Sequence, residues 1–365
     1  MSASKLKIDL TLQNDWLKSG QKPFVIAGPC SAESEEQVLA AAQALDKLPL
    51  VRVFRAGIWK PRTRPNSFEG VGVKGLRWLQ RVKQETRLLT AVEVANAGHV
   101  QAALKFGVDV LWVGARTTAN PFSVQEIADA LSGVDVPVLV KNPVNPDVQL
   151  WVGALERLNN AGIWRLGAIH RGFTTHEKST YRNEPRWQIA IELKRLIPAI
   201  PLICDPSHIA GKPELLHEVS QKALDLTMDG LMIEAHPDPA AALSDADQQI
   251  RPAALRQLLD CLQIRNVNGV AREEDDLLAK LRRQSNAIDY EILELLARRM
   301  EVVKQIGHYK KAHNMTILQV RRWKEVVEDR LEKGASLGLD NDFVKTVYDA
   351  LHAYAIKIQS GVMND

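Results

Sequence analysis

Eight short runs of β-branched and other apolar residues recur between residues 24 and 234, and amphipathic stretches separate them. The runs are FVIA (24–27), LVRVF (50–54), LLTAV (88–92), VLWV (110–113), PVLVK (137–141), WRLGAI (164–169), PLIC (201–204) and LMIE (231–234). Helical periodicity marks intervening segments such as 34–48, 75–85 and 186–196. Strands that alternate with helices in this way predict an α/β fold, a (β/α)8 TIM barrel.

An open, doubly wound parallel sheet shows the same alternation and is the main alternative. Such a sheet usually carries a Gly-rich turn of the form GxGxxG after its first strand. The corresponding turn here is GPCSAE (28–33), which lacks that pattern. The sequence therefore favours the closed barrel.

The amino-acid composition is that of an ordinary globular protein. The chain of 365 residues is long enough for one large and one small domain. Its net charge of +3 gives no reason to expect binding to nucleic acid or to a membrane surface. Three widely spaced cysteines form no disulfide framework, and no signal peptide or run of 18 apolar residues is present. We expect a cytoplasmic protein.

The pattern changes after residue 265. The stretch NVNGVAREEDD (266–276) is polar and acidic, which is typical of a linker, and a long helical pattern follows over 276–312. Two further helices are predicted near 318–334 and 341–360. We therefore expect a barrel over 1–265, a linker over 266–276 and a small all-α, three-helix domain over 277–365. The first helix is too long for the other two to cover, which favours a homodimer joined through it.

Residues with chemically active side chains follow the predicted strands. In a barrel of this kind the loops after the strands form the active site. Any one of these side chains could be structural, but all of them being incidental is improbable, so we expect an active site here. The set is Cys30, Arg55, Lys60, Arg62, Glu93, Arg116, Lys141, Arg171, Asp205, His208 and Glu234.

The set divides by chemistry. Cys30, His208, Glu234 and Asp245 offer one sulfur, one nitrogen and two carboxylates. This mixture suits a divalent transition metal such as Mn, Fe, Co or Zn better than Mg. The cations predict substrates that carry phosphate and carboxylate groups. The segment RAGIWKPRTRP (55–65) alone could be a solvated basic loop, but in this setting we interpret it as a phosphate-binding loop.

The same residues lie in motifs that resemble the 3-deoxy-D-arabino-heptulosonate-7-phosphate (DAHP) synthase family over about 20–265. The motifs are AGPCS (27–31), RAGIWKPRT (55–63), VGAR (113–116), LVK (139–141), HRG (170–172), DPSH (205–208) and IEAHPDP (233–239). The resemblance implies a barrel that condenses phosphoenolpyruvate with erythrose 4-phosphate in the shikimate pathway.

The resemblance also implies residue roles. Cys30, His208, Glu234 and Asp245 would bind the metal, and Arg62 with Thr63 would bind the aldose phosphate. Lys60, which would reach both substrates, is the candidate catalytic acid. The residues implied to bind phosphoenolpyruvate are Arg55, Lys60, Ala115, Arg116, Lys141 and Arg171.

Three alternatives remain for the barrel. A related synthase extends arabinose 5-phosphate and typically reads KANRT where this chain reads KPRT, so Pro61 favours the four-carbon sugar. A more distant relative uses unphosphorylated amino sugars. A non-catalytic regulatory barrel would be expected to have lost metal ligands, and all four are retained here.

The C-terminal segment resembles the all-helical chorismate mutases over about 276–360, through LRRQSNAID (281–289) and LLARRMEVVKQIGHYKK (295–311). The resemblance implies rearrangement of chorismate to prephenate, a reaction that needs the substrate's conformer held and its ether oxygen stabilised. The implied catalytic residues are Arg282, Arg299, Lys310, Arg322 and Gln359, with Arg282 reaching into the partner's site.

Three positions depart from the mutase pattern. Gln319 and Trp323 stand where acidic residues are common, and Ala355 stands where a serine is common. The mutase is therefore expected to be less conventional. The domain is also a candidate allosteric sensor of chorismate or prephenate, and the alternative is a domain that only regulates or dimerises.

Overall fold

The structure is a computed structural model of the chain, and it describes residues 10–13, 22–60, 68–175, 179–265 and 272–364. The chain forms two compact units, residues 1–267 and 268–365. Each unit is described separately.

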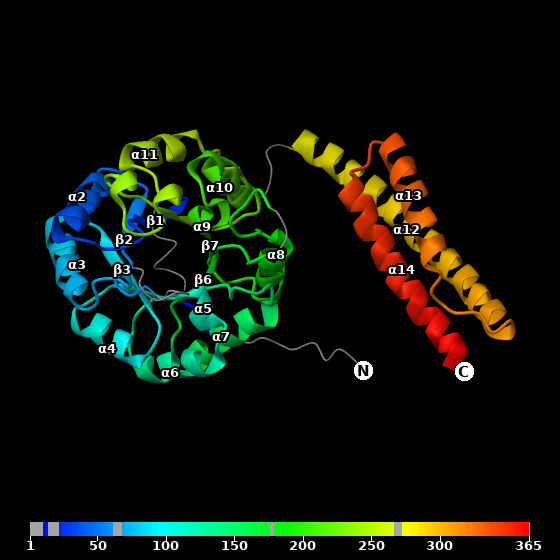
Figure 1. The fold of residues 1–365 in the computed structure, drawn as a ribbon. Coiled ribbons are helices and arrows are strands. Elements are labelled where there is room, and N and C mark those ends of the chain that lie inside the picture. The colour runs from blue at the N-terminus through cyan, green and yellow to red at the C-terminus, as the bar shows by residue number, and fades with distance from the viewer. Residues whose placement is uncertain (1–9, 14–21, 61–67, 176–178, 266–271, 365) are drawn as a thin grey trace. The chain divides into compact units, whose positions relative to one another are not determined.

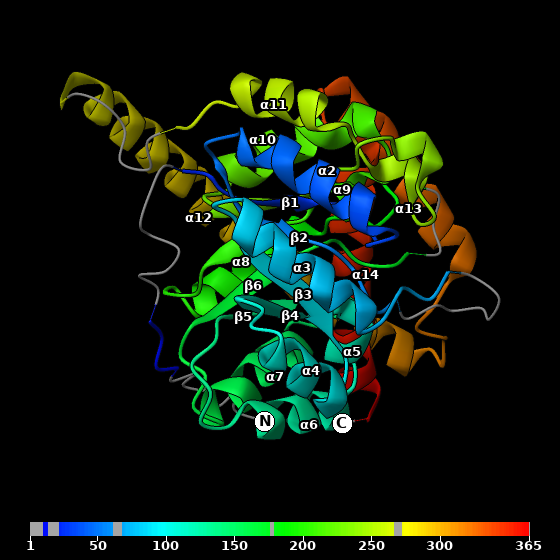
Figure 2. The same cartoon turned by 90° about the vertical axis from the view of Figure 1, so that its left-hand side faces the viewer.

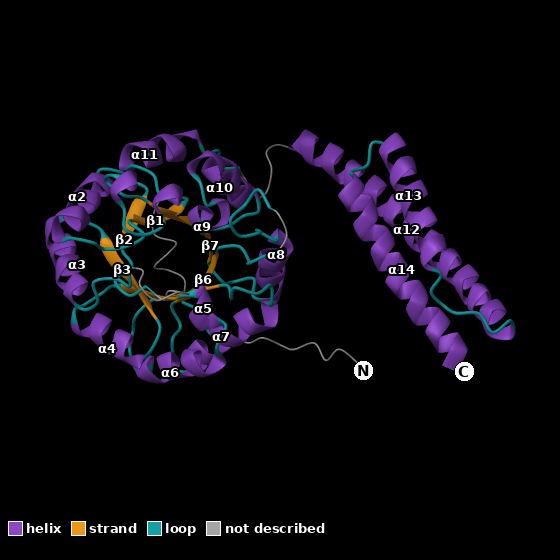
Figure 3. Cartoon of the chain, in the orientation of Figure 1, coloured by secondary structure: helices purple, strands orange, loops and turns teal. Residues whose placement is uncertain are grey.

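The first unit is a closed barrel of eight parallel strands in chain order, with β8 paired to β1 (Figures 1 and 3). The predicted (β/α)8 fold is confirmed, and the open-sheet alternative is excluded by this closure. The strands are β1 (Phe24–Gly28), β2 (Val51–Arg55), β3 (Leu89–Val94), β4 (Val110–Val113), β5 (Val138–Lys141), β6 (Leu166–His170), β7 (Leu202–Cys204) and β8 (Gly230–Glu234).

Helices surround the strands, and α2, α3 and α4 lie on the side of the barrel that faces the viewer in Figure 2. The main helices are α2 (Glu35–Asp46), α3 (Lys74–Glu85), α4 (Ala97–Lys105), α6 (Pro121–Leu131), α7 (Val148–Asn160), α8 (Trp187–Leu196), α10 (Leu216–Asp225) and α11 (Pro252–Cys261). The short helices α5 (Ala115–Thr118) and α9 (Pro206–Ala210) follow β4 and β7 directly, at the strand ends.

Alternation along each strand divides the apolar core into two layers. Successive strand side chains point to opposite faces. In β1, Phe24 and Ile26 belong to the inner cluster, which fills the barrel, whereas Val25 and Ala27 belong to the outer cluster beneath the helices. Trp112 is the largest residue of the inner cluster and is fully buried. The barrel is therefore a packed core with its chemistry restricted to one end.

The second unit consists of α12 (Arg272–Ala312), α13 (Val320–Ser336) and α14 (Asn341–Asn364). The helix α12 begins at Arg272, inside the segment predicted as linker, and residues 266–271 lie outside the described residues. A Cβ at Gly334 would lie 2.6 Å from a methyl carbon of Val344, so glycine allows α13 to pack closely on α14. Three helices were predicted here, and the described residues of this unit form three.

Large apolar residues remain exposed along α12. Tyr290 is 70% exposed and Leu293 is 61% exposed, and Leu277, Leu281 and Ile288 are each more than half exposed. Single exposed apolar residues are common, but a row of them along one helix marks a surface that can bind a partner. Among the helices of the described residues, none has the length and apolar character required to cross a membrane.

Candidate functional site

At the carboxyl ends of the barrel strands, Arg55 at the end of β2 pairs with Glu234 at the end of β8. Nη1 of Arg55 lies 2.6 Å from Oε1 of Glu234, and Nη2 of Arg55 donates to the carbonyl of Cys30 at 3.2 Å. The same guanidinium lies over the ring of Trp112, 5.0 Å from its centroid. Arg55, Glu234 and Cys30 are all buried. Because neither charge can move to solvent, this ion pair fixes the geometry beneath the site.

Lys60 lies in the loop after β2 and reaches back to the loop after β1. Its Nζ donates to the carbonyl of Cys30 at 3.0 Å and to the Cys30 sulfur at 2.8 Å. A Cβ at Gly57 would lie 2.5 Å from that carbonyl oxygen, so glycine is required for the close approach of the two loops. The ammonium of Lys60 therefore lies beside a potential metal ligand.

A second network joins β5 to the segment after β7. Lys141 Nζ donates to Asp205 Oδ2 at 2.7 Å, and His208 Nδ1 lies 2.8 Å from the same oxygen. The other oxygen of Asp205 accepts from the backbone N–H of His208 at 3.1 Å. Burial alone would raise the pKa of Asp205, but His208 and Lys141 hold it well below its usual value. Asp205 is thus an ionised carboxylate that orients both neighbours.

The four predicted metal ligands lie at this face as two close pairs. Cys30 Sγ lies 3.1 Å from Asp245 Oδ2, and His208 Nε2 lies 3.9 Å from Glu234 Oε1. Among the described residues, no three His, Cys, Asp or Glu side chains form one closed ligand set. A thiol, an imidazole and two carboxylates nevertheless fit a divalent transition ion by their chemistry.

The protonation state of the Cys30 thiol affects how well these residues can bind a divalent metal. Burial raises the pKa of Cys30 to about 12, and the charge of Glu234 acts in the same direction. Although burial alone would raise it, the charges of His208 and Arg55 lower the pKa of Glu234 to about 2. The carboxylate is therefore ionised at neutral pH, whereas the thiol must lose a proton to bind an ion.

Arg171 lies at the end of β6 and is held by two asparagines. Its backbone N–H donates to Asn142 Oδ1 at 2.7 Å, and its Nη1 donates to Asn183 Oδ1 at 2.7 Å. Burial, opposed by Asp205 and assisted by Arg182 and Arg116, lowers the pKa of Arg171 to about 10. The charges of Arg182 and Arg116 therefore both act on the guanidinium of Arg171.

Other predicted positions are distributed as follows. Glu93 lies within β3 and accepts from the indole N–H of Trp112 at 2.9 Å. Ala115 begins the short helix α5, directly before Arg116. Arg62 and Thr63 lie outside the described residues.

Four residues at the same face were not anticipated from the sequence. They share amide or guanidinium side chains and bridge the loops: Asn142, Arg182, Asn183 and Gln248. Amide side chains carry no charge and are not preferred metal ligands. A search of the strand ends for charged or metal-binding side chains therefore does not find Asn142, Asn183 or Gln248. Arg182 lies in the segment TYRNEP (180–185), well past the end of β6, and only its basic character could have drawn notice.

In the helical unit, three of the five predicted residues are largely buried or have a buried polar atom. Arg299, Lys310 and Gln359 come from α12 and α14; Lys310 is 9% exposed and Gln359 is 8% exposed. Oε1 of Gln359 and Nη1 of Arg299 are buried and have no hydrogen-bond partner within the described residues. Buried polar atoms rarely remain unpaired in folded proteins, so these two atoms indicate a place for a polar ligand.

The other two predicted residues have no such burial. Arg282 is exposed on α12, and Arg322 is exposed and lies 3.4 Å from Glu325. Trp323, one of the departures from the mutase pattern, stacks on His352 with ring centroids 3.7 Å apart and 12° between the planes. Burial and then the charge of Arg299 lower the pKa of His352, so the aromatic pair lies near the cations.

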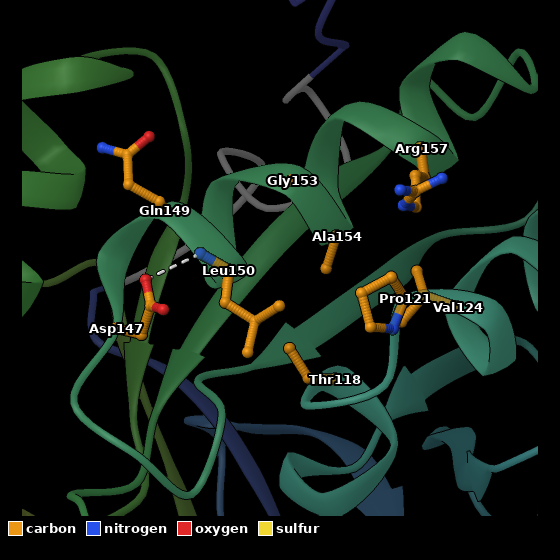
Figure 4. Close-up of a pocket in the computed structure, with 9 residues that line it drawn as sticks. All are labelled: Thr118, Pro121, Val124, Asp147, Gln149, Leu150, Gly153, Ala154 and Arg157. Carbon is orange, nitrogen blue, oxygen red and sulfur yellow. Dashed lines mark hydrogen bonds between the residues drawn. The ribbon is translucent and has the colours of Figure 1, made fainter.

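A separate cavity of about 300 Å³ lies on the outer wall between α6 and α7 (Figure 4). Asp147, one of its lining residues, accepts a hydrogen bond from the backbone N–H of Leu150 at 3.0 Å and so caps α7. Pro121, Val124 and Ala154 line the apolar part. None of the predicted site residues lines this cavity.

Two families match the chain in adjacent segments. The DAHP synthetase I family matches residues 7–267, and the chorismate mutase type II family matches residues 281–360. These segments correspond to the barrel and to the helical unit.

Individual relatives match the barrel segment. A phospho-2-dehydro-3-deoxyheptonate aldolase from Thermotoga maritima is 30% identical over 235 residues, which cover 64% of this chain and 67% of that protein. A 2-dehydro-3-deoxyphosphooctonate aldolase from Desulfotalea psychrophila is 28% identical over 264 residues, covering 66% and 89%. A crystal structure of the Thermotoga maritima DAHP synthase aligns with a TM-score of 0.58 and 28% identity, covering 65% of this chain and 66% of that chain.

Proposed function

The chain belongs to the DAHP synthetase I family and carries a chorismate mutase type II domain, the domain composition of a bifunctional shikimate-pathway enzyme, and on that premise we propose its two reactions. The barrel condenses phosphoenolpyruvate with erythrose 4-phosphate, and the helical unit rearranges chorismate to prephenate. The observation that supports the first reaction best is the convergence of Arg55, Lys60 and Lys141 with four metal-capable side chains at one end of the barrel.

In the barrel, cations bind phosphoenolpyruvate. Arg171 and Arg116 lie near each other, and Lys141 is held by Asp205 at 2.7 Å. Fixed guanidinium and ammonium groups stabilise charge that moves between carboxylate and phosphate without reorganising. Ala115 lies directly beside Arg116, at the start of α5, where its backbone N–H can add to the anion site. We assign the aldose phosphate to Arg62 and Thr63.

Lys60 is the proposed general acid. Carbon 3 of phosphoenolpyruvate attacks the aldehyde carbon, and Lys60 Nζ protonates the oxygen that develops negative charge. Water then attacks carbon 2, and phosphate leaves by cleavage of the C–O bond. The position of Lys60 beside Cys30 supports this role because it puts the acid next to the proposed metal site.

DAHP synthases are generally metal-dependent, and Cys30, His208, Glu234 and Asp245 would hold the ion in this chain. A divalent Mn, Fe, Co or Zn ion bound there supplies Lewis-acid polarisation of the aldehyde. Arg55 fixes Glu234, and Asp205 fixes His208, so both ligands are oriented by buried partners.

In the helical unit, Arg299, Lys310 and Gln359 bind chorismate, with Arg322 and the partner's copy of Arg282 completing the site. The unpaired Arg299 Nη1 and Gln359 Oε1 support this assignment. The stack of Trp323 on His352 offers an apolar wall in place of an acidic side chain.

We further propose a cytoplasmic homodimer joined through α12, in which prephenate or chorismate bound to the helical unit inhibits the barrel. The exposed apolar residues of α12 support the dimer. The free thiols of Cys30, Cys204 and Cys261 fit a reducing compartment. Inhibition of this kind requires a coupling free energy between sites of about 1–3 kcal/mol.

The substrates test the proposal directly. The purified chain is given phosphoenolpyruvate with erythrose 4-phosphate, phosphoenolpyruvate with arabinose 5-phosphate, or chorismate alone, and the loss of each substrate is recorded. We expect consumption in the first and third assays. Preferential use of arabinose 5-phosphate would favour the reaction named for the phosphooctonate relatives. No loss of chorismate would leave the helical unit with a regulatory or dimerising role only.

A further inference from the structure

Two residues outside the predicted metal site connect its two carboxylates. Gln248 lies in the loop after β8 and is 1% exposed, and Arg182 lies in the loop after β6. Gln248 Nε2 donates to Glu234 Oε2 at 2.6 Å, and Gln248 Oε1 accepts from Arg182 Nη1. Arg182 Nη2 in turn donates to Asp245 Oδ1 at 2.9 Å. A continuous chain of hydrogen bonds therefore runs from Glu234 to Asp245.

The orientation of the Gln248 amide follows from its partners. A carboxylate only accepts hydrogen bonds and a guanidinium only donates them. The amide must therefore turn its NH₂ to Glu234 and its oxygen to Arg182. A glutamate at this position would face the carboxylate of Glu234, and a lysine would face Arg182. Glutamine is thus matched to both neighbours at once.

The bonds divide the oxygens of each carboxylate. In Glu234, Oε2 accepts from Gln248, whereas Oε1 accepts from Arg55 Nη1 at 2.6 Å and also lies 3.9 Å from the imidazole nitrogen of His208. In Asp245, Oδ1 is occupied by Arg182, whereas Oδ2 lies 3.1 Å from the sulfur of Cys30. One oxygen of each carboxylate is thus bonded to Gln248 or Arg182, and the other faces a neighbouring sulfur or nitrogen donor.

The backbone supports the same arrangement. Asp245 has a left-handed backbone with φ of 48°, which is uncommon outside glycine and costs about 1 kcal/mol or more. A Cβ at Gly211 would lie 2.4 Å from the Cβ of Arg182, so glycine is needed where the loop after β7 passes Arg182. The backbone N–H of Arg182 donates to the carbonyl of Ala210 at 3.4 Å. The loops after β6, β7 and β8 are therefore fixed together around these side chains.

We propose that Gln248 and Arg182 are positioning residues that set the affinity of the barrel for its divalent metal. They do so by holding Glu234 and Asp245 with one oxygen each directed toward Cys30 and His208. The inference rests on the proposed metal site. Partners that orient metal ligands typically contribute about 10- to 100-fold to metal affinity.

The test titrates Mn²⁺ into the metal-free full chain by calorimetry. Gln248→Met removes both hydrogen bonds of the side-chain amide at nearly constant volume. Gln248→Glu keeps the hydrogen-bond acceptor for Arg182 but loses the donor to Glu234. Arg182→Lys keeps the charge but loses the two-pronged contact, and serves if the Gln248 variants do not fold. Gln221→Met is the matched control, because Gln221 also bonds through its amide but lies on α10, away from the site. Thermal unfolding without metal checks that each variant is folded.

We expect Gln248→Met, Gln248→Glu and Arg182→Lys to weaken Mn²⁺ binding about 10- to 100-fold, with Gln221→Met unchanged. With Co²⁺ as the probe, the thiolate-to-cobalt absorption should still appear in Gln248→Met, but at higher Co²⁺ concentration. Affinity equal to wild type in the folded variants would overturn the inference and leave the metal site standing. If instead the wild type binds neither ion, or Cys30→Ser binds them as tightly as wild type, the metal site itself is wrong and the inference falls with it.

Discussion

The ammonium of Lys60 lies 2.8 Å from the sulfur of Cys30, although the two residues come from loops after different strands. The same nitrogen also donates to the carbonyl of Cys30 at 3.0 Å. A cation held at two points beside a proposed metal ligand can deliver a proton without searching for its position. This relationship makes Lys60 the most specific candidate for the acid of the condensation.

Replacing Lys60 with Met should lower kcat of the condensation about 10²- to 10⁴-fold, because it removes both a general acid and a cation. Mn²⁺ binding should persist, since none of the four proposed ligands changes. Steady-state kinetics and calorimetry on the same preparation provide the two measurements. Lys222→Met, on the outer helix α10, is the control and should match wild type. Near-normal turnover in Lys60→Met would remove Lys60 from the mechanism.

Replacing Gln359 with Met should lower the rate of chorismate rearrangement about 10²-fold or more, as expected when one preorganised polar contact to the transition state is lost. The condensation in the barrel should be unchanged. Gln305→Met is the matched control, because Gln305 is an exposed glutamine on α12. If both variants rearranged chorismate equally well, the unpaired oxygen of Gln359 would not contribute to the rearrangement.

His170 should make the barrel less stable in acid. It is fully buried among Trp151, Phe173 and Trp187, and burial lowers its pKa from 6.5 to about 3. Since its folded pKa is depressed, its contribution to stability is complete above pH 6.5 and declines as the pH falls toward 3. At pH 4 the loss amounts to about 3 kcal/mol.

Replacing His170 with Phe removes this titration and keeps an aromatic ring in the aromatic surroundings. Between pH 7 and pH 4 the variant should lose about 3 kcal/mol less unfolding free energy than wild type, measured by urea unfolding. Any effect of the substitution on packing changes the unfolding free energy equally at both pH values and so leaves this difference intact. Parallel pH dependence in the two proteins would show that His170 is not the buried group responsible.

Prephenate should inhibit the condensation in the full chain, by the coupling expected between the two units. In Arg299→Ala, where the proposed dicarboxylate site has lost a cation, the condensation should proceed at the normal rate but resist prephenate. Barrel kinetics at increasing prephenate give both results. Equal inhibition of wild type and Arg299→Ala would place the inhibitor elsewhere, most simply in the barrel itself.

The barrel could be predicted because its signal is repeated eight times. Alternating strands and helices, with inward Phe24 and Ile26 and outward Val25 and Ala27, leave little choice of architecture. The ends of strands were less well predicted. Arg55 ends β2 one residue beyond the predicted run, because a polar side chain directed into the mouth of a barrel still has a strand backbone, whereas β8 ends at Glu234 as predicted.

The sequence singled out most charged and metal-capable side chains of the candidate site, but not Arg182 or the amides that contact them. Glu234 was identified from its place after an apolar run, whereas Gln248 was not, because its importance depends on contact with Glu234 and Arg182 across two loops. Spacing along the chain does not reveal such contacts. In the helical unit, Arg282 and Arg322 are exposed whereas Gln359 is buried, and the reach of Arg282 into a partner's site stays a prediction.

The central claim is that one chain performs a metal-dependent condensation and a metal-independent rearrangement. One measurement tests it: in separate samples, the purified chain receives phosphoenolpyruvate with erythrose 4-phosphate, or chorismate alone, each with and without a strong chelator, and the three substrates are followed by NMR. We expect phosphoenolpyruvate and erythrose 4-phosphate to persist in chelator and to be consumed once Mn²⁺ is restored. Chorismate should disappear at the same rate throughout, because its rearrangement uses only Arg299, Lys310, Gln359 and their neighbours. Condensation at full rate in excess chelator, or a mutase that stops with it, would contradict the claim.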